Sequence, residues 1–367
     1  MPHLFDPLSL RDVTLANRVV VSPMCEYSSV DGFANDWHFV HLGCRAVGGA
    51  ALVFTEATAV APEARISPDD LGMWSDRHCE PVERIVRFIH SQHTRAGMQL
   101  AHAGRKGSTL APWKGHGQVA PDEGGWEPVG PGDEPFSKGY PIPRGLATAD
   151  LPGIVAAFRD AARRARDVGL DVVEIHAAHG YLIHEFLSPL TNRRSDSYGG
   201  SFDNRIRLCV EIVEAVRDVW PERLPLFVRI SATDWTDGGW DIEQSIELCR
   251  RLGERGVDLV DCSSGGNVAN AEIPLGPGYQ TPFAARIRRE AQIATGTVGL
   301  ITSAMQADHI IRTGQADCVL IARELLRDPY WPLRAARELG HRMPWPAQYL
   351  RAAPAGAPPR QADPPAS

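Results

Sequence analysis

The sequence predicts an α/β protein, a single (β/α)8 barrel, and three observations carry this prediction. Short apolar runs typical of buried parallel strands alternate eight times with segments of helical spacing. The chain has 367 residues, which suits a barrel of this kind with added loops. Polar residues gather directly after the apolar runs, at the ends where parallel barrels place their chemistry.

Each predicted strand is a short run rich in valine, isoleucine, leucine or alanine. Such a run suits a strand that is buried on both faces, and glycine, proline and polar residues mark its ends. In chain order the strands are expected at residues 18–22, 50–54, 98–101, 172–175, 226–230, 259–262, 297–300 and 318–322.

Each predicted strand is followed by a segment with the spacing of an amphipathic helix. In the second such segment Val82, Ile85 and Ile89 fall on one face. The third and fifth segments end at Gly169 and Gly256, and glycine is a common residue directly after a helix. In chain order the helices are expected at residues 36–47, 76–95, 149–168, 202–220, 242–255, 283–291, 304–312 and 324–339.

Two long polar loops interrupt this alternation. Residues 104–148 are rich in glycine and proline and include Lys106 and Trp113. A connection of this length is usually functional, so we expect it to form part of a mobile lid. Residues 190–201 form a second polar loop after the fourth strand.

The two ends of the chain also fall outside the eight units. Residues 13–17 are expected to pair as a small hairpin under the barrel floor. The last residues, 353–367, are rich in proline and alanine and predict a disordered tail, because they bury no apolar area. The barrel domain would then span residues 1–352.

Composition excludes several classes of function. The apolar content of 43% supports a large core, and the net charge of −7 is spread without a basic stripe that would suggest nucleic acid. No run is long and apolar enough to span a membrane, and no secretory signal is visible, so we expect a cytoplasmic protein. The seven cysteines include no C-x-x-C pair, which argues against disulfides, zinc and iron–sulfur clusters. No metal is expected.

The most informative segment is residues 171–181, DVVEIHAAHGY. Its predicted strand ends in His176, and His179 and Tyr181 follow within the next turn. Imidazoles can hold and polarise a substrate oxygen, and a phenol can deliver a proton. A single histidine here would more simply cap a helix, but three such residues at one strand end favour catalysis.

Other strand ends supply a second set of candidates. The ends of strands six to eight offer small residues and one cation, at Ser264, Gly265, Gly299, Leu300, Ala322 and Arg323. Free backbone N–H groups beside an arginine form the usual phosphate site of a barrel. Each piece alone could also be a tight turn with an arginine facing solvent.

These residues resemble the Old Yellow Enzyme family of FMN-dependent ene-reductases. The resemblance extends from Leu4 to about Arg351. Its motifs are SPMCEYS at 22–28, QLAHAGRK at 99–106, EIHAAHGYL at 174–182, NRRSDSYGGSFDNR at 192–205 and VGLITS at 298–303. Cys25, together with a histidine at position 179, resembles the bacterial thermophilic-like subgroup, which includes xenobiotic reductase A-like enzymes.

The resemblance implies where FMN would bind. Arg323 and the backbone of Gly299, Leu300 and Ala322 would hold its phosphate, near Ser264 and Gly265. Gln99 would bond the pyrimidine edge of the ring, and Arg229 would stabilise the charge of the reduced ring. Pro23, Ala59 and His176 would contact the flavin, and Cys25 would tune its potential. Cys25 could equally be a small buried hydrophobe, as most free cysteines are.

The resemblance also implies the reaction. NADPH or NADH would reduce FMN, and hydride would then pass to Cβ of an enone, enal, maleimide or nitro compound. His176 and His179 would bind the substrate oxygen, Tyr181 would protonate Cα, and Tyr27 would face the substrate. Glu26 stands where the family often has glutamine, and its effect is open. Arg351 matches a position that reaches the neighbouring subunit's pocket, which implies a homodimer or homotetramer. From the residues alone, Arg351 could also be a surface arginine at the edge of the tail.

Two other functions remain open on the sequence. One is a larger relative of the dienoyl-CoA reductase type, whose clustered cysteines and additional domains are missing here. The other is a non-redox barrel such as an aldolase or a sugar-phosphate isomerase. Glu56 and Asp234 lie near strand ends, but they form no clear catalytic set for such chemistry.

Overall fold

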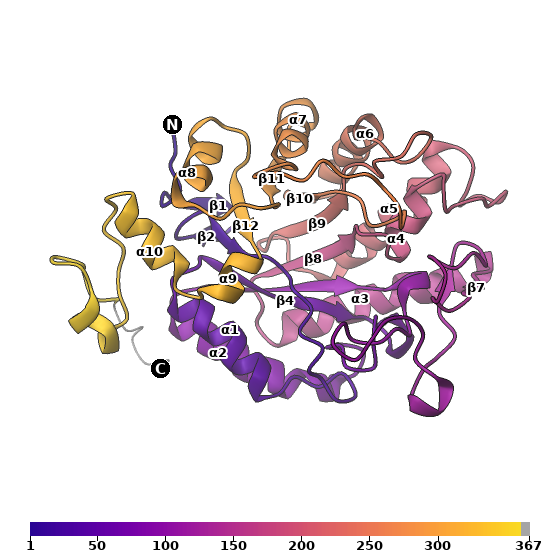
Figure 1. The fold of residues 1–367 in the computed structure, drawn as a ribbon, viewed down its shortest axis with the longest axis horizontal. Helices are drawn as coiled ribbons and strands as arrows, with labels where there is room; N and C mark the ends of the chain where they lie inside the picture. The colour runs from indigo at the N-terminus through magenta and orange to yellow at the C-terminus, as the bar shows by residue number, and fades with distance from the viewer. Residues whose placement is uncertain (361–367) are drawn as a thin grey trace.

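In the computed structural model, which describes residues 1–360, eight parallel strands form a closed barrel surrounded by helices (Figure 1). The strands follow one another around the barrel in the order β3, β4, β5, β8, β9, β10, β11 and β12. The predicted (β/α)8 fold is confirmed. The barrel strands are β3 (Val19–Val21), β4 (Leu52–Ala59), β5 (Arg95–Ala101), β8 (Val172–Ala177), β9 (Leu226–Ser231), β10 (Leu259–Ser263), β11 (Ala294–Thr297) and β12 (Cys318–Ile321).

The helices that surround the barrel follow the predicted segments closely. They are α1 (Asp36–Val47), α2 (Cys79–Ser91), α3 (Leu151–Asp167), α5 (Phe202–Val219), α6 (Ile242–Gly253), α7 (Thr281–Ala291), α8 (Ala304–Arg312), α9 (Arg323–Arg327) and α10 (Trp331–Glu338). The side chain of Asn35 accepts a hydrogen bond at the start of α1, which fixes the predicted first residue. A short helix after β8, α4 (Leu182–Leu187), is absent from the prediction.

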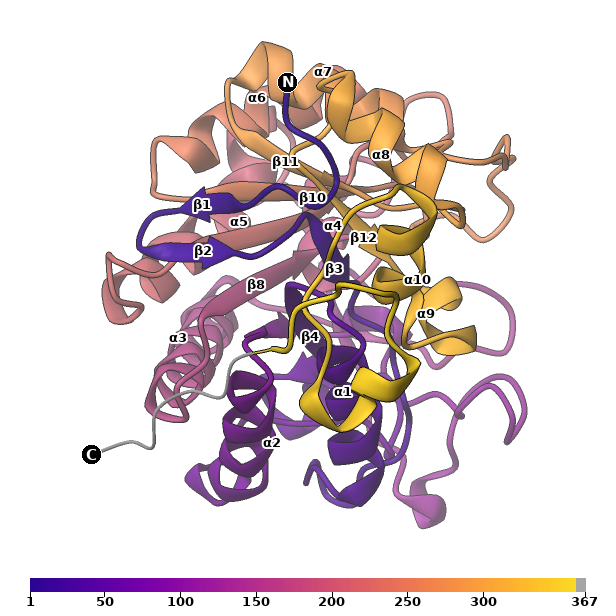
Figure 2. The ribbon, with the colours of Figure 1, turned by 90° about the vertical axis from the view of Figure 1, so that its left-hand side faces the viewer.

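An antiparallel hairpin of β1 (Leu8–Leu10) and β2 (Val13–Leu15) lies at one end of the molecule (Figure 2). The expected hairpin is confirmed, although its pairing begins earlier than residue 13. Val13 and Leu15 are buried in one cluster with Phe54 and Phe227 from inside the barrel. Each such apolar side chain contributes about 1.5–3 kcal/mol when fully buried. This half of the interior is therefore apolar and closed, and polar chemistry is confined to the other half.

Two predicted elements were placed wrongly. The seventh strand was expected at 297–300, but β11 ends at Thr297, because Gly299 and Leu300 have φ angles of +127° and +51° and turn the chain. The helix expected at 324–339 is broken between α9 and α10, where Pro329 lies. Proline lacks the N–H that a continuous helix would require.

The C-terminal residues lie beside α1 and α10. A 3-10 helix, η6 (Ala347–Ala352), carries Tyr349, whose ring contacts Tyr330. Of the tail predicted to be disordered, residues 353–360 are described by the structure, and residues 361–367 lie outside the described range. The Arg360 side chain donates hydrogen bonds to the carbonyl oxygens of Ala46 and Val47, which holds this part of the tail against the barrel.

Candidate active site

The turn between β8 and α4 carries the two histidines and the tyrosine that the sequence singles out. His179 and Gly180 have φ angles of +61° and +70°. A Cβ at Gly180 would lie 2.3 Å from the carbonyl oxygen of Gly266, so only glycine fits there. The loops after β8 and β10 therefore touch backbone to backbone.

A buried hydrogen-bond network fixes this turn from behind. The N–H of Gly180 donates to His184 Nδ1 at 2.9 Å, and His184 Nε2 lies 3.0 Å from Asp234 Oδ1. Asp234 also accepts hydrogen bonds from Ser188 Oγ and the Trp240 N–H. Asp234 is fully buried and one of its oxygens already accepts two hydrogen bonds, so it positions the turn and is not a free catalytic base.

His176, His179 and Tyr181 form one compact cluster. The His176 ring centroid lies 5.1 Å from that of His179 and 5.0 Å from that of Tyr181, with nearly perpendicular planes. The N–H of Ala178 donates to His176 Nδ1 at 3.3 Å, which places the ring proton on Nε2. Burial, with the nearby Arg229 cation, holds the pKa of both histidines well below the usual range. Both are therefore neutral hydrogen-bond donors near pH 7.

Two serines and the protein interior complete the environment of this cluster. His179 Nε2 lies 2.7 Å from Ser263 Oγ, and the backbone N–H of His179 donates to Ser231 Oγ. Burial raises the pKa of the Tyr181 phenol well above its usual range. Tyr181 therefore keeps its proton at neutral pH until an acceptor reaches it.

Four polar side chains from adjacent strands fill the barrel interior beneath the histidines. Gln99 Nε2 donates to Glu174 Oε1 at 2.7 Å, and Arg229 Nε lies 3.1 Å from Asp261 Oδ2. Burial raises the pKa of both carboxyls, and the Arg229 cation opposes this rise. Arg229 Nε has no aligned hydrogen-bond acceptor, so its guanidinium is incompletely satisfied by the protein.

The predicted phosphate residues meet at the ends of β10, β11 and β12. Within residues 1–360, the N–H groups of Gly299 and Leu300 donate to no protein acceptor, and the exposed Arg323 side chain forms no ion pair. A Cβ at Gly299 would lie 2.9 Å from the Tyr279 ring, so the backbone is open only because this residue is glycine. Ser264 is hydrogen-bonded to Tyr279 and Gln280, two residues that no sequence motif predicted for this site.

The end of β3 brings Pro23, Cys25 and Tyr27 to the same mouth. The Cys25 thiol is hydrogen-bonded to the Tyr27 hydroxyl, and burial raises its pKa well above the usual range, so it is a thiol and not a thiolate. Ala59 lies nearby in β4, but its N–H donates to Leu71 and its carbonyl accepts from Met73. It can therefore offer a cofactor its methyl surface but no backbone donor.

Behind Cys25, two carboxylates pair with two histidines. Glu56 Oε1 lies 3.1 Å from His38 Nε2, and Glu26 Oε1 lies 3.2 Å from His41 Nε2. Glu56 also accepts the backbone N–H of Glu26. Glu56 is thus a structural anchor of the loop after β3 and is not a free base for barrel chemistry.

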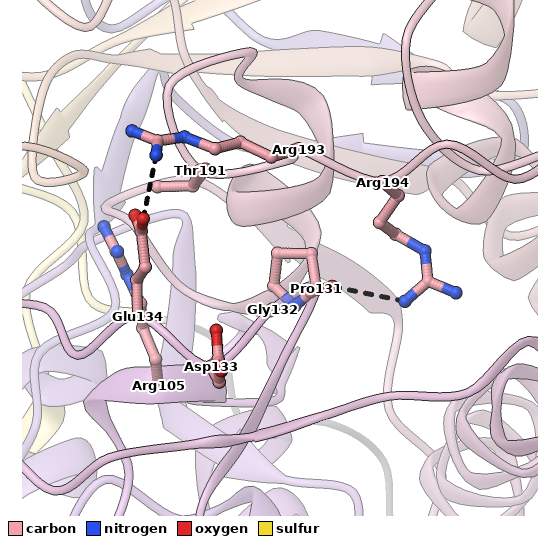
Figure 3. A pocket seen from close by; sticks show the side chains of 8 residues that line it. All are labelled: Arg105, Pro131, Gly132, Asp133, Glu134, Thr191, Arg193 and Arg194. Carbon is pink, nitrogen blue, oxygen red and sulfur yellow. Dashed lines mark hydrogen bonds and ion pairs between the residues drawn. The ribbon is translucent and has the colours of Figure 1, made fainter.

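The long loop after β5 is fastened to the loop after α4 around a pocket of about 210 Å³ (Figure 3). Glu134 pairs with Arg193 at 2.8 Å, and Arg194 donates to the carbonyl of Pro131. Further along the same loop, the Phe136 ring covers Lys106, with Nζ 4.0 Å from the ring centroid. This loop therefore covers the side of the mouth next to Tyr181.

Arg351 is the predicted site residue that lies apart from this cluster. It is exposed on η6, within the yellow C-terminal segment of the ribbon in Figure 1. Within residues 1–360 it forms no hydrogen bond or ion pair with the residues at its own barrel mouth.

A buried mouth with neutral imidazole donors, a phenol and an open anion cradle defines a barrel enzyme that binds a phosphate-bearing cofactor. Residues 3–341 match the NADH:flavin oxidoreductase / NADH oxidase family. The chain belongs to this family, the Old Yellow Enzyme family. It is 49% identical over 350 residues to the NADPH dehydrogenase of Geobacillus sp. (strain WCH70), covering 95% of this chain and 98% of the relative.

Solved structures show the same fold. Morphinone reductase in complex with tetrahydroNAD is 29% identical, with a TM-score of 0.77 over 94% of this chain and 93% of that one. A 2-naphthoyl-CoA reductase superposes with a TM-score of 0.82 at 24% identity, and this chain spans only 52% of its length. The likeness to that larger protein concerns the fold alone. The non-redox alternative is wrong, because the family is one of flavin oxidoreductases.

The protein is therefore an FMN-dependent NAD(P)H oxidoreductase, and its residues fit the cofactor. The unsatisfied Arg229 Nε, the open N–H groups of Gly299 and Leu300 and the unpaired Arg323 are the donors that an anionic flavin phosphate and a reduced ring require. No group of three His, Cys, Asp or Glu side chains among the described residues is arranged to hold a metal ion. No helix within residues 1–360 is long and apolar enough to cross a membrane.

Proposed function

We propose that the enzyme is an ene-reductase that reduces the C=C bond of enones, enals, maleimides or nitro compounds. The observation that carries this proposal is the single cluster of His176, His179 and Tyr181, with ring centroids 5.0 to 6.5 Å apart. Two neutral donors and one protonated phenol are what a conjugated carbonyl needs, because negative charge develops on its oxygen and a proton is needed at Cα.

Each residue of the cluster has a separate task in this proposal. His176 and His179 donate hydrogen bonds to the substrate oxygen, which withdraws charge from the alkene and favours addition at Cβ. Tyr181 gives its proton to Cα. When bound, FMN supplies the hydride after reduction by NADPH or NADH. His176 is buried and Tyr181 and His179 are half-buried, which limits the access of bulk water to the cluster.

We assign the cofactor and substrate contacts on the same basis. The cofactor contacts are Pro23, Cys25, Ala59, Gln99, His176, Arg229, Ser264, Gly265, Gly299, Leu300, Ala322 and Arg323. The substrate contacts are Tyr27, His176, His179, Tyr181 and Arg351. The pair of Cys25 and His179 supports assignment to the thermophilic-like subgroup.

Arg351 enters this proposal through a second copy of the chain. Among the described residues, Arg351 is exposed and forms no hydrogen bond or ion pair with the barrel mouth of its own chain. A groove of about 760 Å³ opens beside Cys25. Exposed Trp37, Val40 and Trp113 border this groove. An apolar border of this kind is typical of a protein interface. We therefore assign a homodimer or homotetramer in which Arg351 completes the neighbouring site.

An anaerobic visible spectrum tests the proposed function. The purified holoenzyme should show flavin absorbance that bleaches with NADPH and returns when 2-cyclohexenone is added. Bleaching without recovery by any enone, enal, maleimide or nitroalkene would contradict the alkene substrate and leave the flavin oxidoreductase. The same titration with NADH ranks the two reductants.

A further inference from the structure

Lys106 is a lysine of the active-site wall that the proposed reaction does not yet use. It lies in η3 (Gly104–Lys106), directly after β5. Its Nζ donates a hydrogen bond to the carbonyl oxygen of His179 at 2.7 Å and another to the carbonyl of Gly266. It also lies 5.6 Å from the centroid of the Tyr181 ring. The ammonium thus joins the loops after β8 and β10 at the face of the phenol.

No carboxylate within residues 1–360 forms an ion pair with Lys106. Glu185, the carboxyl whose charge acts on Lys106, accepts the backbone N–H of Arg105 instead, and burial raises the Glu185 pKa to about 8. The aromatic face of Phe136 covers the ammonium from the other side. An ammonium held by carbonyl dipoles and two aromatic rings is not neutralised by a carboxylate. It can therefore stabilise a negative charge that forms beside it.

We propose that Lys106 stabilises the tyrosinate that Tyr181 becomes when it delivers its proton, an inference that rests on the proposed function. In that step the O–H bond of Tyr181 breaks and the Cα–H bond of the product forms. The electron pair of the O–H bond stays on the phenolate oxygen and spreads into the ring that Lys106 faces. Solvent then returns one proton to the phenolate. Lys106 acts as a positioned cation and gives up no proton of its own.

The surrounding charges make this effect dependent on pH. Burial, together with the Arg105 cation, lowers the Lys106 pKa to about 7, while Glu185 opposes the shift. His176 and His179 also face this region, and their lowered pKa values keep them neutral there. Raising the pH through about 7 should therefore discharge Lys106 and leave the histidines unchanged.

The test separates the two half-reactions of the holoenzyme by stopped flow across pH values on both sides of 7. At pH values below the Lys106 pKa, Lys106→Met should slow flavin reoxidation by 2-cyclohexenone about tenfold. This is a part of the roughly 10²–10⁴-fold rate acceleration that a general acid supplies. Flavin reduction by NADPH should be unchanged. The wild-type rate should fall toward the Lys106→Met rate as the pH rises, because both side chains are then uncharged.

Lys106→Arg distinguishes charge from packing, because a guanidinium stays protonated at every pH used. Its reoxidation rate should remain high above the wild-type transition. The matched control is Lys114→Met, which removes one positive charge from the same loop, where Lys114 is paired with Asp69. Lys114→Met should retain the wild-type rate and pH transition.

The outcomes distinguish this inference from the proposed function. If wild type reduces the enone and Tyr181→Phe slows reoxidation, but Lys106→Met with intact flavin absorbance reoxidises at the wild-type rate, the role of Lys106 is refuted alone. A wild-type pH transition that persists unchanged in Lys106→Arg refutes it as well. If wild type reduces no activated alkene, the proposed function itself fails.

Discussion

Phenol binding should depend more strongly on His176 than on His179. A phenolate oxygen imitates the substrate oxygen, and p-hydroxybenzaldehyde is a suitable probe. His176 Nδ1 already accepts the Ala178 N–H, so its Nε2–H is free to donate. His179 Nε2 is engaged with Ser263 Oγ at 2.7 Å and must leave this partner first.

These contacts set the expected magnitudes. A hydrogen bond to a charged group contributes about 1.5–3 kcal/mol, so His176→Ala should weaken phenolate binding about 10- to 150-fold. Release of the neutral bond to Ser263 costs about 0.5–1.5 kcal/mol, which leaves roughly 1 kcal/mol, or about fivefold, for His179→Ala. In a Ser263→Ala background the His179→Ala effect should grow toward that of His176→Ala, because no competing bond is broken.

The assay is a titration of the charge-transfer absorbance that a phenolate develops against the flavin. His309→Ala serves as the control, since His309 is exposed on α8 outside the barrel. An unchanged dissociation constant in His176→Ala would refute the reasoning. A larger loss in His179→Ala than in His176→Ala would refute the assignment of the free donor.

Three further predictions follow from the same site. Tyr181→Phe should slow flavin reoxidation by an enone about 10²–10⁴-fold and leave reduction by NADPH unchanged, and equal slowing of both steps in stopped flow would refute its role. Glu174→Gln should remove part of the pH dependence of stability. Because burial raises the Glu174 pKa above its unfolded value, the wild type should lose stability as the pH rises above about 4.3, and calorimetry should find a flatter profile in the variant. Arg351→Ala should raise KM for the enone without altering flavin content, and unchanged turnover and KM would rule out a shared site.

Local sequence signals were enough to predict most of the fold. The apolar runs placed seven of the eight strands, and the cap at Asn35 matches the start of α1. The error at the seventh strand has a local cause. The residue types at 297–300 are compatible with a strand, but Gly299 adopts a φ of +127°, which ends the strand before it. The break in the last helix could have been predicted from Pro329, because a proline interrupts a helix even where the apolar spacing is helical.

The candidate site was predictable only where one short motif holds its residues. His176, His179 and Tyr181 lie within six positions, and the structure brings them together. The residues that hold them do not share a motif. His184 meets Asp234 from the next strand unit, and Ser263 reaches His179 from a strand 84 positions away. Only the closed barrel creates such contacts, so they could not be predicted from composition or residue spacing.

The contact between Gly180 and the Gly266 carbonyl has a consequence for how this active site can evolve. With no side chain between the two backbones, the loop after β10 cannot be lengthened or reshaped without displacing His179. Substitutions that widen substrate scope should therefore accumulate in the long loop after β5, which meets its neighbours through side chains such as Glu134 and Phe136. The outer part of the loop after β5 is thus open to variation, and the contact between the loops after β8 and β10 is fixed by two glycines.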